Sequence, residues 1–295
     1  MIAHAPSLAA EAIVRLEEAA QRFEVPAGRG AMVWRRFGEG PPLVLLHGGH
    51  GNWLHWARNI DALAARFELW LPDLPAYGES ATPPEPTLEV LLAATQDSLD
   101  ALVGKGTPIA LAGFSFGGLV ATQLALRRGR ITRMALLGPG GHGGARRPRG
   151  ELRSWRDAYA QKDVDGLREV MRHNLLMHML AGQDVDALAL EIHTRACLQT
   201  RFRSKPISRA GGLNDALIRF EEPLLLIWGE HDITATPTEL AHALVTACRN
   251  ARAEIVPGAG HWVQYQAAAH VDSLLLGWFA QDAAGASHRM PASPI

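Results

Sequence analysis

Residues 113–117 read Gly113-Phe114-Ser115-Phe116-Gly117, and the interpretation of the whole chain starts from this stretch. It follows an apolar segment at 108–112 that suits a strand, and it opens a segment up to residue 128 that suits a helix. A serine on so sharp a turn needs small neighbours, because glycines two residues away let backbone pack closely around it. The context favours Ser115 as an exposed nucleophile, with an ordinary glycine turn as the alternative.

Apolar segments of strand length recur along the chain, at residues 31–37, 42–47, 67–72, 108–113, 131–138, 223–229 and 253–257. Several are continuous apolar runs, which is typical of strands covered on both faces. Segments with helical spacing lie before or between them, at 6–21, 87–103 and 117–128, and one more follows His261. The alternation predicts an α/β fold with a mostly parallel central sheet flanked by helices.

The alternation stops between about residues 140 and 222, where no segment resembles a strand. A Gly- and Arg-rich stretch at 140–147 leads into two or three polar helices, for example at 151–161 and 185–200. We therefore expect the first part of the core with an N-terminal helix at 1–140, a helical cap at 141–220, the second part of the core at 221–281 and a flexible tail at 282–295.

A glycine-rich loop, His47-Gly48-Gly49, ends one of the early strands. Such a loop can aim a backbone N–H at the carbonyl oxygen that a nucleophile attacks. We predict an oxyanion hole formed by the N–H groups of Gly49 and Phe116, with a tight turn as the alternative for this loop. The nearby histidines, His47, His50 and His55, are interpreted as structural.

The base that activates Ser115 is predicted to be His261, in a loop that follows a strand and leads into the last helix. Gly258 and Gly260 would leave this histidine free to swing toward the serine. Gly48, Phe114 and Trp262, which adjoin the predicted groups, are candidates for contacting a substrate.

A carboxylate must fix the imidazole tautomer and stabilise the imidazolium that forms. Asp232 lies just beyond the strand at 223–229 and completes the order serine, acid, histidine. Glu230 is the rival acid. The other usual place, after the strand ending near Leu137, offers no carboxylate.

Composition bounds the remaining functions. The 295 residues are 47% hydrophobic, and the formal net charge of -1 favours neither nucleic acid nor an anionic membrane as partner. The two cysteines, Cys197 and Cys248, match no zinc or redox spacing, and no apolar window has the length of a signal peptide or a membrane span. We expect a cytoplasmic protein with a small-molecule substrate and no cofactor or metal; assembly into a homo-oligomer stays open.

With these residues in place, the chain resembles the α/β-hydrolase superfamily from about residue 34 to 279. Five ordered matches carry the resemblance: residues 46–49, 72–80, 113–117, 229–232 and 260–262. The resemblance implies an eight-stranded core with a helical cap inserted after the sixth strand.

Within that superfamily, residues 260–265 look like the corresponding segment of meta-cleavage-product hydrolases, which cut carbon–carbon bonds in ring-fission products. The chain departs from their serine segment at Gly113 and Phe116. Those enzymes use a cap arginine for a substrate carboxylate, and the candidates here are Arg201, Arg203 and Arg209, with exposed cap charges as the alternative.

Three functions follow from these observations. Hydrolysis of a carboxylic ester or lactone of a small to medium apolar substrate comes first, because it needs only the groups already found. Carbon–carbon hydrolysis of an aromatic ring-fission product is the alternative. The third is a ligand receptor on a hydrolase scaffold.

Overall fold

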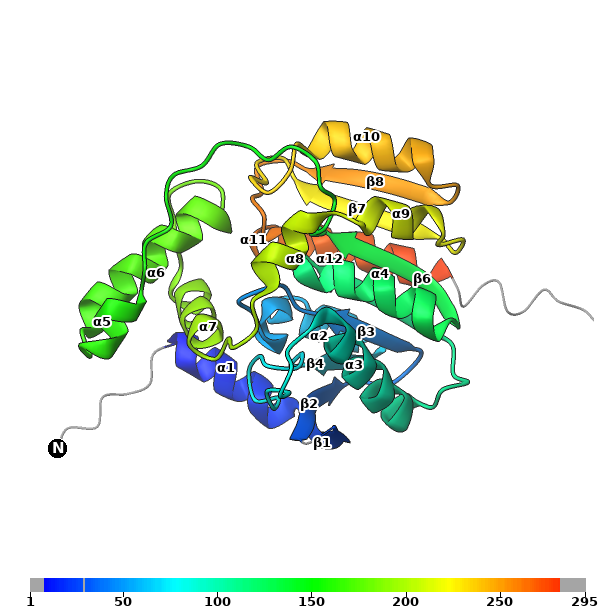
Figure 1. Ribbon diagram of the computed structural model, residues 1–295, viewed down its shortest axis with the longest axis horizontal. Helices are drawn as coiled ribbons and strands as arrows, with labels where there is room; N and C mark the ends of the chain where they lie inside the picture. Colours follow the sequence, from blue (N-terminus) through cyan, green and yellow to red (C-terminus); the bar gives the residue numbers. More distant parts are fainter. Residues whose placement is uncertain (1–7, 29, 282–295) are drawn as a thin grey trace, which may run out of the picture.

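A computed structural model describes residues 8–28 and 30–281, and among them one sheet holds eight strands in the order β1-β2-β4-β3-β5-β6-β7-β8 (Figure 1). The first two pairs in that order, β1 with β2 and β2 with β4, are antiparallel; the other five pairs are parallel. This confirms the predicted fold class. The strands are β1 Gln21–Ala27, β2 Gly30–Phe37, β3 Pro42–Leu46, β4 Glu68–Pro72, β5 Ile109–Phe114, β6 Ile131–Leu137, β7 Leu224–Gly229 and β8 Ala251–Val256.

Helices connect the strands and cover both faces of the sheet (Figure 1). Their bounds in the described ranges are α1 Leu8–Ala19, α2 Ile60–Ala64, α3 Leu88–Val103, α4 Phe116–Arg128, α5 Arg156–Ala160, α6 Val164–His178, α7 Ala187–Leu198, α8 Ser204–Ala210, α9 Leu213–Ile218, α10 Pro237–Ala247, α11 Val263–Gln266 and α12 Ala268–Phe279, with a 3₁₀ turn η1 at Trp53–Trp56. No helix within these ranges has the length and apolar character to cross a membrane.

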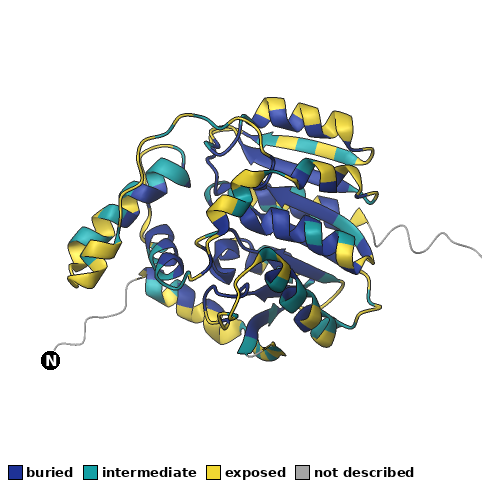
Figure 2. Cartoon of the chain, viewed as in Figure 1, coloured by how far each residue is buried: buried dark blue, intermediate teal, exposed yellow. Residues whose placement is uncertain are grey.

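The continuous apolar runs are explained by two hydrophobic cores, one on each face of the sheet. In β3, Leu43 and Leu45 enter the core that α2 and α12 cover, and Val44 and Leu46 enter the core that α3, α4 and α10 cover. Every side chain of β3 after Pro42 is buried, as Figure 2 shows for the central strands in general. Alternation between polar and apolar residues disappears because neither face meets water.

The interval from 141 to 220, which we call the cap segment, lies between β6 and β7 and contains helices α5 to α9. The helix expected at 151–161 begins only at Arg156. The residues before Arg156 are held outside the helix by contacts with α6. The Asn174 side chain on α6 accepts from the Arg153 N–H at 2.8 Å and donates to the Arg153 carbonyl at 2.9 Å. These two bonds hold Arg153 in a segment without regular secondary structure, where the residue pattern predicted a helix. The predicted tail at 282–295 lies outside the described residues.

Strand β1 was missed by the sequence analysis. None of its residues is buried, and it pairs only with β2 at the edge of the sheet. Pro26 lies within it. Proline is tolerated in an edge strand because the backbone groups on the outer side of that strand have no neighbouring strand to bond. The residues of β1 alternate between exposed and half-buried, and they are too polar for the sequence pattern to distinguish this strand from a loop.

The loop after β4 is organised by one buried carboxylate, Asp73. It accepts from the N–H of Trp53 at 3.1 Å and from the N–H of Glu79 at 3.0 Å, and it pairs with the Arg35 guanidinium at 3.2 Å. Both charged side chains are almost fully buried. Gly78 is required beside it, because a Cβ there would stand 2.3 Å from the Asp73 carboxyl carbon. Through these bonds Asp73 holds η1 and the 72–80 segment together after the end of β4.

We expect Asp73→Asn to lower the free energy of unfolding by about 3 kcal/mol, because it removes the buried one of the two carboxylates that pair with Arg35, leaving partly exposed Glu79, and places an amide N–H against backbone donors. Urea denaturation followed by fluorescence measures the change. Asp61→Asn is the matched control, since the Asp61–Arg15 pair is largely exposed and should contribute under about 1 kcal/mol. Equal losses in the two variants would contradict this account of the loop.

Candidate active site

Ser115 lies on the turn between β5 and α4 with φ 53° and ψ −116°, a conformation that L residues rarely adopt. Its N–H donates to the Leu137 carbonyl at 2.9 Å, and its own carbonyl accepts from the N–H groups of Gly118 and Gly140. The flanking glycines are required by space: a Cβ on Gly113 would stand 2.4 Å from the Gly117 carbonyl oxygen, and one on Gly117 would stand 2.4 Å from the His47 carbonyl oxygen. The turn therefore holds the serine side chain at the carboxyl edge of the sheet.

The structure brings the three predicted catalytic residues together. Ser115 Oγ lies 2.9 Å from His261 Nε2, and His261 Nδ1 lies 2.8 Å from Asp232 Oδ2. The serine comes from the β5–α4 turn, the aspartate from the loop after β7 and the histidine from the loop after β8. The distances suit transfer of the serine proton to the imidazole, with the carboxylate holding the Nδ1–H tautomer.

Asp232 is fully buried, yet it is held in its charged form. Its Oδ1 accepts from the Thr234 N–H and from the Thr234 hydroxyl, each at 2.7 Å. Burial alone would raise the pKa of Asp232, but the charge and hydrogen bond of His261 and the two bonds from Thr234 outweigh it, so the pKa lies below its usual value. Because the pKa of Asp232 is lower in the folded than in the unfolded protein, its carboxylate stabilises the fold at pH values above the unfolded pKa. That stabilisation is lost as the pH falls through the folded pKa.

Glu230, the rival acid, points away from His261. Its side chain is half exposed, and Oε2 accepts from the Gly258 N–H at 2.9 Å. The other usual place for the acid is occupied by Gly138, where φ is 49° and a Cβ would stand 2.9 Å from Asp232 Oδ2 and 3.0 Å from His261 Nδ1. Glycine at this position leaves the space in which the carboxylate and imidazole meet.

The predicted oxyanion donors lie beside the serine. A Cβ on Gly48 would stand 3.1 Å from Ser115 Cβ, and one on Gly49 would stand 3.7 Å from Phe116 Cβ, so this loop runs directly past the nucleophile. Phe116 is the first residue of α4, and an N–H there has no acceptor inside its own helix. Two backbone donors beside a nucleophile can bind a developing negative charge on oxygen.

The loop carrying His261 is held more firmly than the sequence suggested. Gly260 was expected to let the histidine swing, but a Cβ on it would stand 2.6 Å from the Ala181 nitrogen. The Gly260 N–H donates to Gln266 Oε1 at 2.8 Å, and the Trp262 N–H donates to the Met179 carbonyl at 2.7 Å. Gly260 therefore permits close packing against the end of α6, which fixes the loop.

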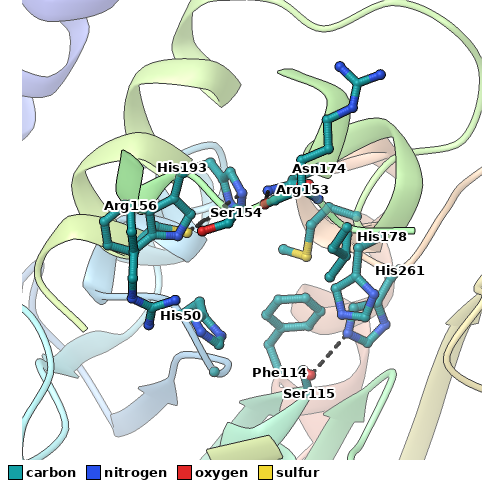
Figure 3. A pocket seen from close by; sticks show the side chains of 15 residues that line it. His50, Phe114, Ser115, Arg153, Ser154, Arg156, Asn174, His178, His193 and His261 are labelled. Atoms are coloured by element: carbon teal, nitrogen blue, oxygen red, sulfur yellow. Dashed lines mark hydrogen bonds between the residues drawn. The ribbon is translucent and has the colours of Figure 1, made fainter. Parts of the chain in front are cut away.

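Two cavities meet at Ser115, and both lie between the cap segment and the sheet edge. They share Gly49, His50, Ser115, Leu152 and His178. The first, of about 170 Å³, is shown in Figure 3 and is further lined by Phe114, Arg153, Ser154, Trp155, Arg156, Asn174, Met179, His193, Cys197 and His261. The second, of about 130 Å³, is further lined by Phe116, Gly140, Arg146, Arg149, Ser204, Lys205, Ser208, Arg209 and Thr234.

Several candidate substrate residues do not face these cavities. Trp262 is buried: its Nε1–H donates to the His55 carbonyl at 2.9 Å, and its ring stacks on Tyr265. The Arg201 guanidinium is occupied by the carbonyls of Gly78 and Ser80 at 3.1 and 2.7 Å, and exposed Arg203 lines neither cavity. Of the candidates, Phe114 and Arg209 line a cavity, whereas Gly48 lines neither and packs against the Phe114 ring.

His178, the last residue of α6, was missed by the sequence analysis although it lines both cavities. Its ring centroid lies 5.6 Å from that of His261, and Figure 3 shows the two imidazoles next to each other. Its buried Nδ1 has no hydrogen-bond partner. Burial, and next the neighbouring His261, hold the pKa of His178 well below its usual value, so the ring is neutral near pH 7. No local pattern distinguishes it from an ordinary histidine of a polar helix.

Cys197, which lines the first cavity, is not an activated nucleophile. Cys197 Sγ lies 3.6 Å from His193 Nε2, but burial raises the pKa of the Cys197 thiol to about 12. Burial, with a smaller effect from His50, lowers the pKa of His193 to about 4. Both groups are therefore neutral near pH 7 and contribute packing. Within the described ranges, no cluster of three or more His, Cys, Asp or Glu side chains has the arrangement of a metal site.

Comparison with known sequences places this geometry among related proteins. The model of the alpha/beta hydrolase family matches residues 43–272. A pimeloyl-[acyl-carrier protein] methyl ester esterase of Vibrio campbellii is 28% identical over 214 residues, which cover 68% of this chain and 79% of that protein. A 2-hydroxy-6-oxo-6-phenylhexa-2,4-dienoate hydrolase of Burkholderia cepacia is 27% identical over 262 residues, or 82% and 89% of the two chains.

Solved structures share the fold. A naproxen esterase from Bacillus subtilis superposes with a TM-score of 0.71 at 20% identity, covering 94% of this chain and all of the other. A carboxylesterase from the same organism gives a TM-score of 0.70 at 20% identity and covers 92% of this chain and 99% of the other. At 20% identity these superpositions show a shared fold and do not show a shared function.

We expect Asp232→Asn to slow the reaction of Ser115 with a fluorophosphonate by on the order of 10⁴-fold, the scale by which this change lowers turnover in serine–histidine–aspartate triads. Asparagine keeps the shape but favours the wrong imidazole tautomer. Glu230→Gln is the matched control and should react at nearly the normal rate. Labelling rates measured by intact-protein mass spectrometry decide between them; the reverse order would assign the acid to Glu230.

Proposed function

The chain belongs to the alpha/beta hydrolase family, and from this premise we propose that it hydrolyses a carboxylic ester or lactone through an acyl-enzyme on Ser115. The observation that carries the proposal is the relay from Ser115 Oγ to His261 Nε2 and from His261 Nδ1 to Asp232 Oδ2, at 2.9 and 2.8 Å. Nucleophile, base and orienting acid stand in the order and spacing that acyl transfer needs.

In the proposed first half-reaction, Ser115 Oγ attacks the ester carbonyl carbon while His261 Nε2 takes the hydroxyl proton. The carbonyl oxygen becomes an oxyanion, which the N–H groups of Gly49 and Phe116 bind. The carbon–oxygen bond to the alcohol then breaks, and the imidazolium returns its proton to the departing alkoxide. Asp232 stabilises the imidazolium between these two transfers.

In the second half-reaction, a water molecule replaces the alcohol. His261 takes its proton as the hydroxide attacks the acyl carbon, the same two amides bind the second oxyanion, and Ser115 leaves with the proton from His261. The acid and the original serine hydroxyl result. His261 carries every proton in the cycle, and water is the co-reactant of the second half-reaction.

Support for an ester as substrate comes from the relatives. The Vibrio protein is named for hydrolysis of a methyl ester, and the similarity extends over two thirds of this chain. The enclosed volumes beside Ser115, about 170 and 130 Å³, suit small to medium acyl and alcohol parts.

Carbon–carbon hydrolysis is the second candidate. It is favoured by one observation: three relatives named as hydrolases of ring-fission products match 81 to 83% of this chain at 24 to 27% identity. The same serine and histidine would then act on a ketone carbonyl. The activity assay below includes this substrate class.

Ser115→Ala should fold normally and lose at least about 10³-fold in kcat on p-nitrophenyl acetate and butyrate, because only binding and oxyanion stabilisation would remain. Release of p-nitrophenolate measures the rate, and thermal unfolding checks the fold. Ser273→Ala, on the exposed face of α12, is the matched control and should retain normal turnover.

Two outcomes would count against the ester proposal. Comparable turnover by Ser115→Ala would remove Ser115 as nucleophile. Cleavage of 2-hydroxy-6-oxo-6-phenylhexa-2,4-dienoate with a kcat/KM far above that of every ester tried would transfer the assignment to carbon–carbon hydrolysis.

A further inference from the structure

Among the described residues, the second cavity beside Ser115 is lined by four cationic side chains and by no aspartate or glutamate. Arg146 and Arg149 come from the loop after β6, and Lys205 and Arg209 come from α8. Lys205 and Arg209 are four residues apart, so they project from the same side of that helix. The same cavity is also lined by Gly49, Ser115 and Phe116, the groups proposed to attack and to bind the oxyanion.

These cations lack acidic partners within the described residues. Arg146 donates to the Ser208 carbonyl at 3.2 Å, and Arg149 donates to the Gly150 carbonyl at 3.0 Å. The side chains of Lys205 and Arg209 form no hydrogen bond or ion pair in the described part of the chain. Burial, and next the charge of Arg209, lower the pKa of Arg146. The charge of Asp232 acts in the other direction and raises the pKa of Arg146, but it forms no ion pair with it. The four side chains therefore gather positive charge in this cavity, and none of them pairs with a described carboxylate.

The first cavity differs in this respect. Of its two cations, Arg153 pairs with Glu169 at 3.5 Å, whereas Arg156 has a neutral partner, the Trp155 ring at 5.1 Å. Two of its imidazoles, His178 and His193, are held neutral by burial. Cations without an acidic partner are thus more numerous in the second cavity, which has four, than in the first, which has one.

The second cavity, which we call the basic cavity, adjoins Ser115 and opens outward into a wider groove. Buried Ser204, the first residue of α8, lies against Gly49, and Figure 1 shows α8 beside α4. Outward, a wider groove of about 510 Å³ is lined by the same four cations and Arg147, with Glu151 as the one acid among its lining residues in the described chain. An anion can approach along this groove without meeting strong repulsion.

We propose that the substrate ester carries an anionic group, a carboxylate or a phosphate, and that Lys205 and Arg209, with Arg146 and Arg149, bind this group in the second cavity. The inference rests on the proposed function and replaces the apolar substrate expected from the sequence. Arginine forks and a lysine ammonium are the side chains that recognise carboxylates and phosphates, by charge-assisted hydrogen bonds.

The test compares pairs of esters that differ only in charge. Monomethyl glutarate is paired with methyl 4-carbamoylbutanoate, which places the charge on the acyl side, and 4-acetoxybutanoate is paired with 4-acetoxybutanamide, which places it on the alcohol side. In at least one pair, kcat/KM for the anion should exceed that for the amide by about tenfold or more. Raising NaCl from about 0.05 to about 0.5 M should reduce the ratio, because salt screens the attraction.

A phosphate analogue distinguishes the two sources of charge. Methyl 4-(phosphonooxy)butanoate is compared with monomethyl glutarate, and the better substrate identifies which anion the cavity favours; either result supports the proposal.

Variants locate the effect. In the double variant Lys205→Gln with Arg209→Gln, the ratio of anion to amide should fall toward one. Arg203→Gln is the matched control: it removes a cation from the residue before α8, outside both cavities, and the ratio should stay at the wild-type value.

The outcomes separate this inference from the proposed function. Equal kcat/KM for anion and amide in both pairs, with measurable ester hydrolysis, would overturn the inference and leave the esterase proposal standing. An unchanged ratio in the double variant would also overturn it. Failure to hydrolyse these esters and p-nitrophenyl esters alike would instead overturn the proposed function.

Discussion

The backbone turn at Ser115, with φ 53° in a non-glycine residue, is the constraint on which the other features of the site depend. A backbone of this kind costs on the order of 1–3 kcal/mol and persists only where its surroundings enforce it. Here the surroundings are the Gly113–Gly117 contact, the approach of Gly117 to the His47 carbonyl, and the bond from the Ser115 N–H to β6. The same turn places the serine hydroxyl toward His261 and the first amide of α4 beside the 47–49 loop.

The geometry of the proposed catalytic residues is also coupled to the cap segment. The His261 loop is bonded to the end of α6 through Trp262 and Met179, and Gln266 bonds to both Gly260 and Ala181. His178 and Met179, at the end of that helix, line the first cavity beside the imidazole. A displacement of α6 would thus move the base as well as the cavity wall, which links cap position to reaction geometry.

The fold and the three central residues were accessible from the sequence because their signals are local. Gly113 and Gly117 on either side of Ser115, and Gly138 where a carboxylate could have stood, are each required by close contacts at one backbone position. Continuous apolar runs indicate strands that are covered on both faces. The direction in which a side chain points was not accessible: Trp262 follows His261 but turns into the core, and Arg201 turns back to the 78–80 loop. The basic cavity draws its cations from two segments about sixty residues apart, and their meeting depends on how the cap segment folds over the sheet.

The proposed function depends on one covalent step, the acylation of Ser115. Acid quenching during turnover of p-nitrophenyl acetate, followed by peptide mass spectrometry, detects this acyl-enzyme. We predict one added acetyl group on the peptide that contains Ser115, and none on that peptide in Ser115→Ala. Steady turnover with no acetyl group on Ser115, or with the acetyl group on another residue such as His261 or Cys197, would contradict it.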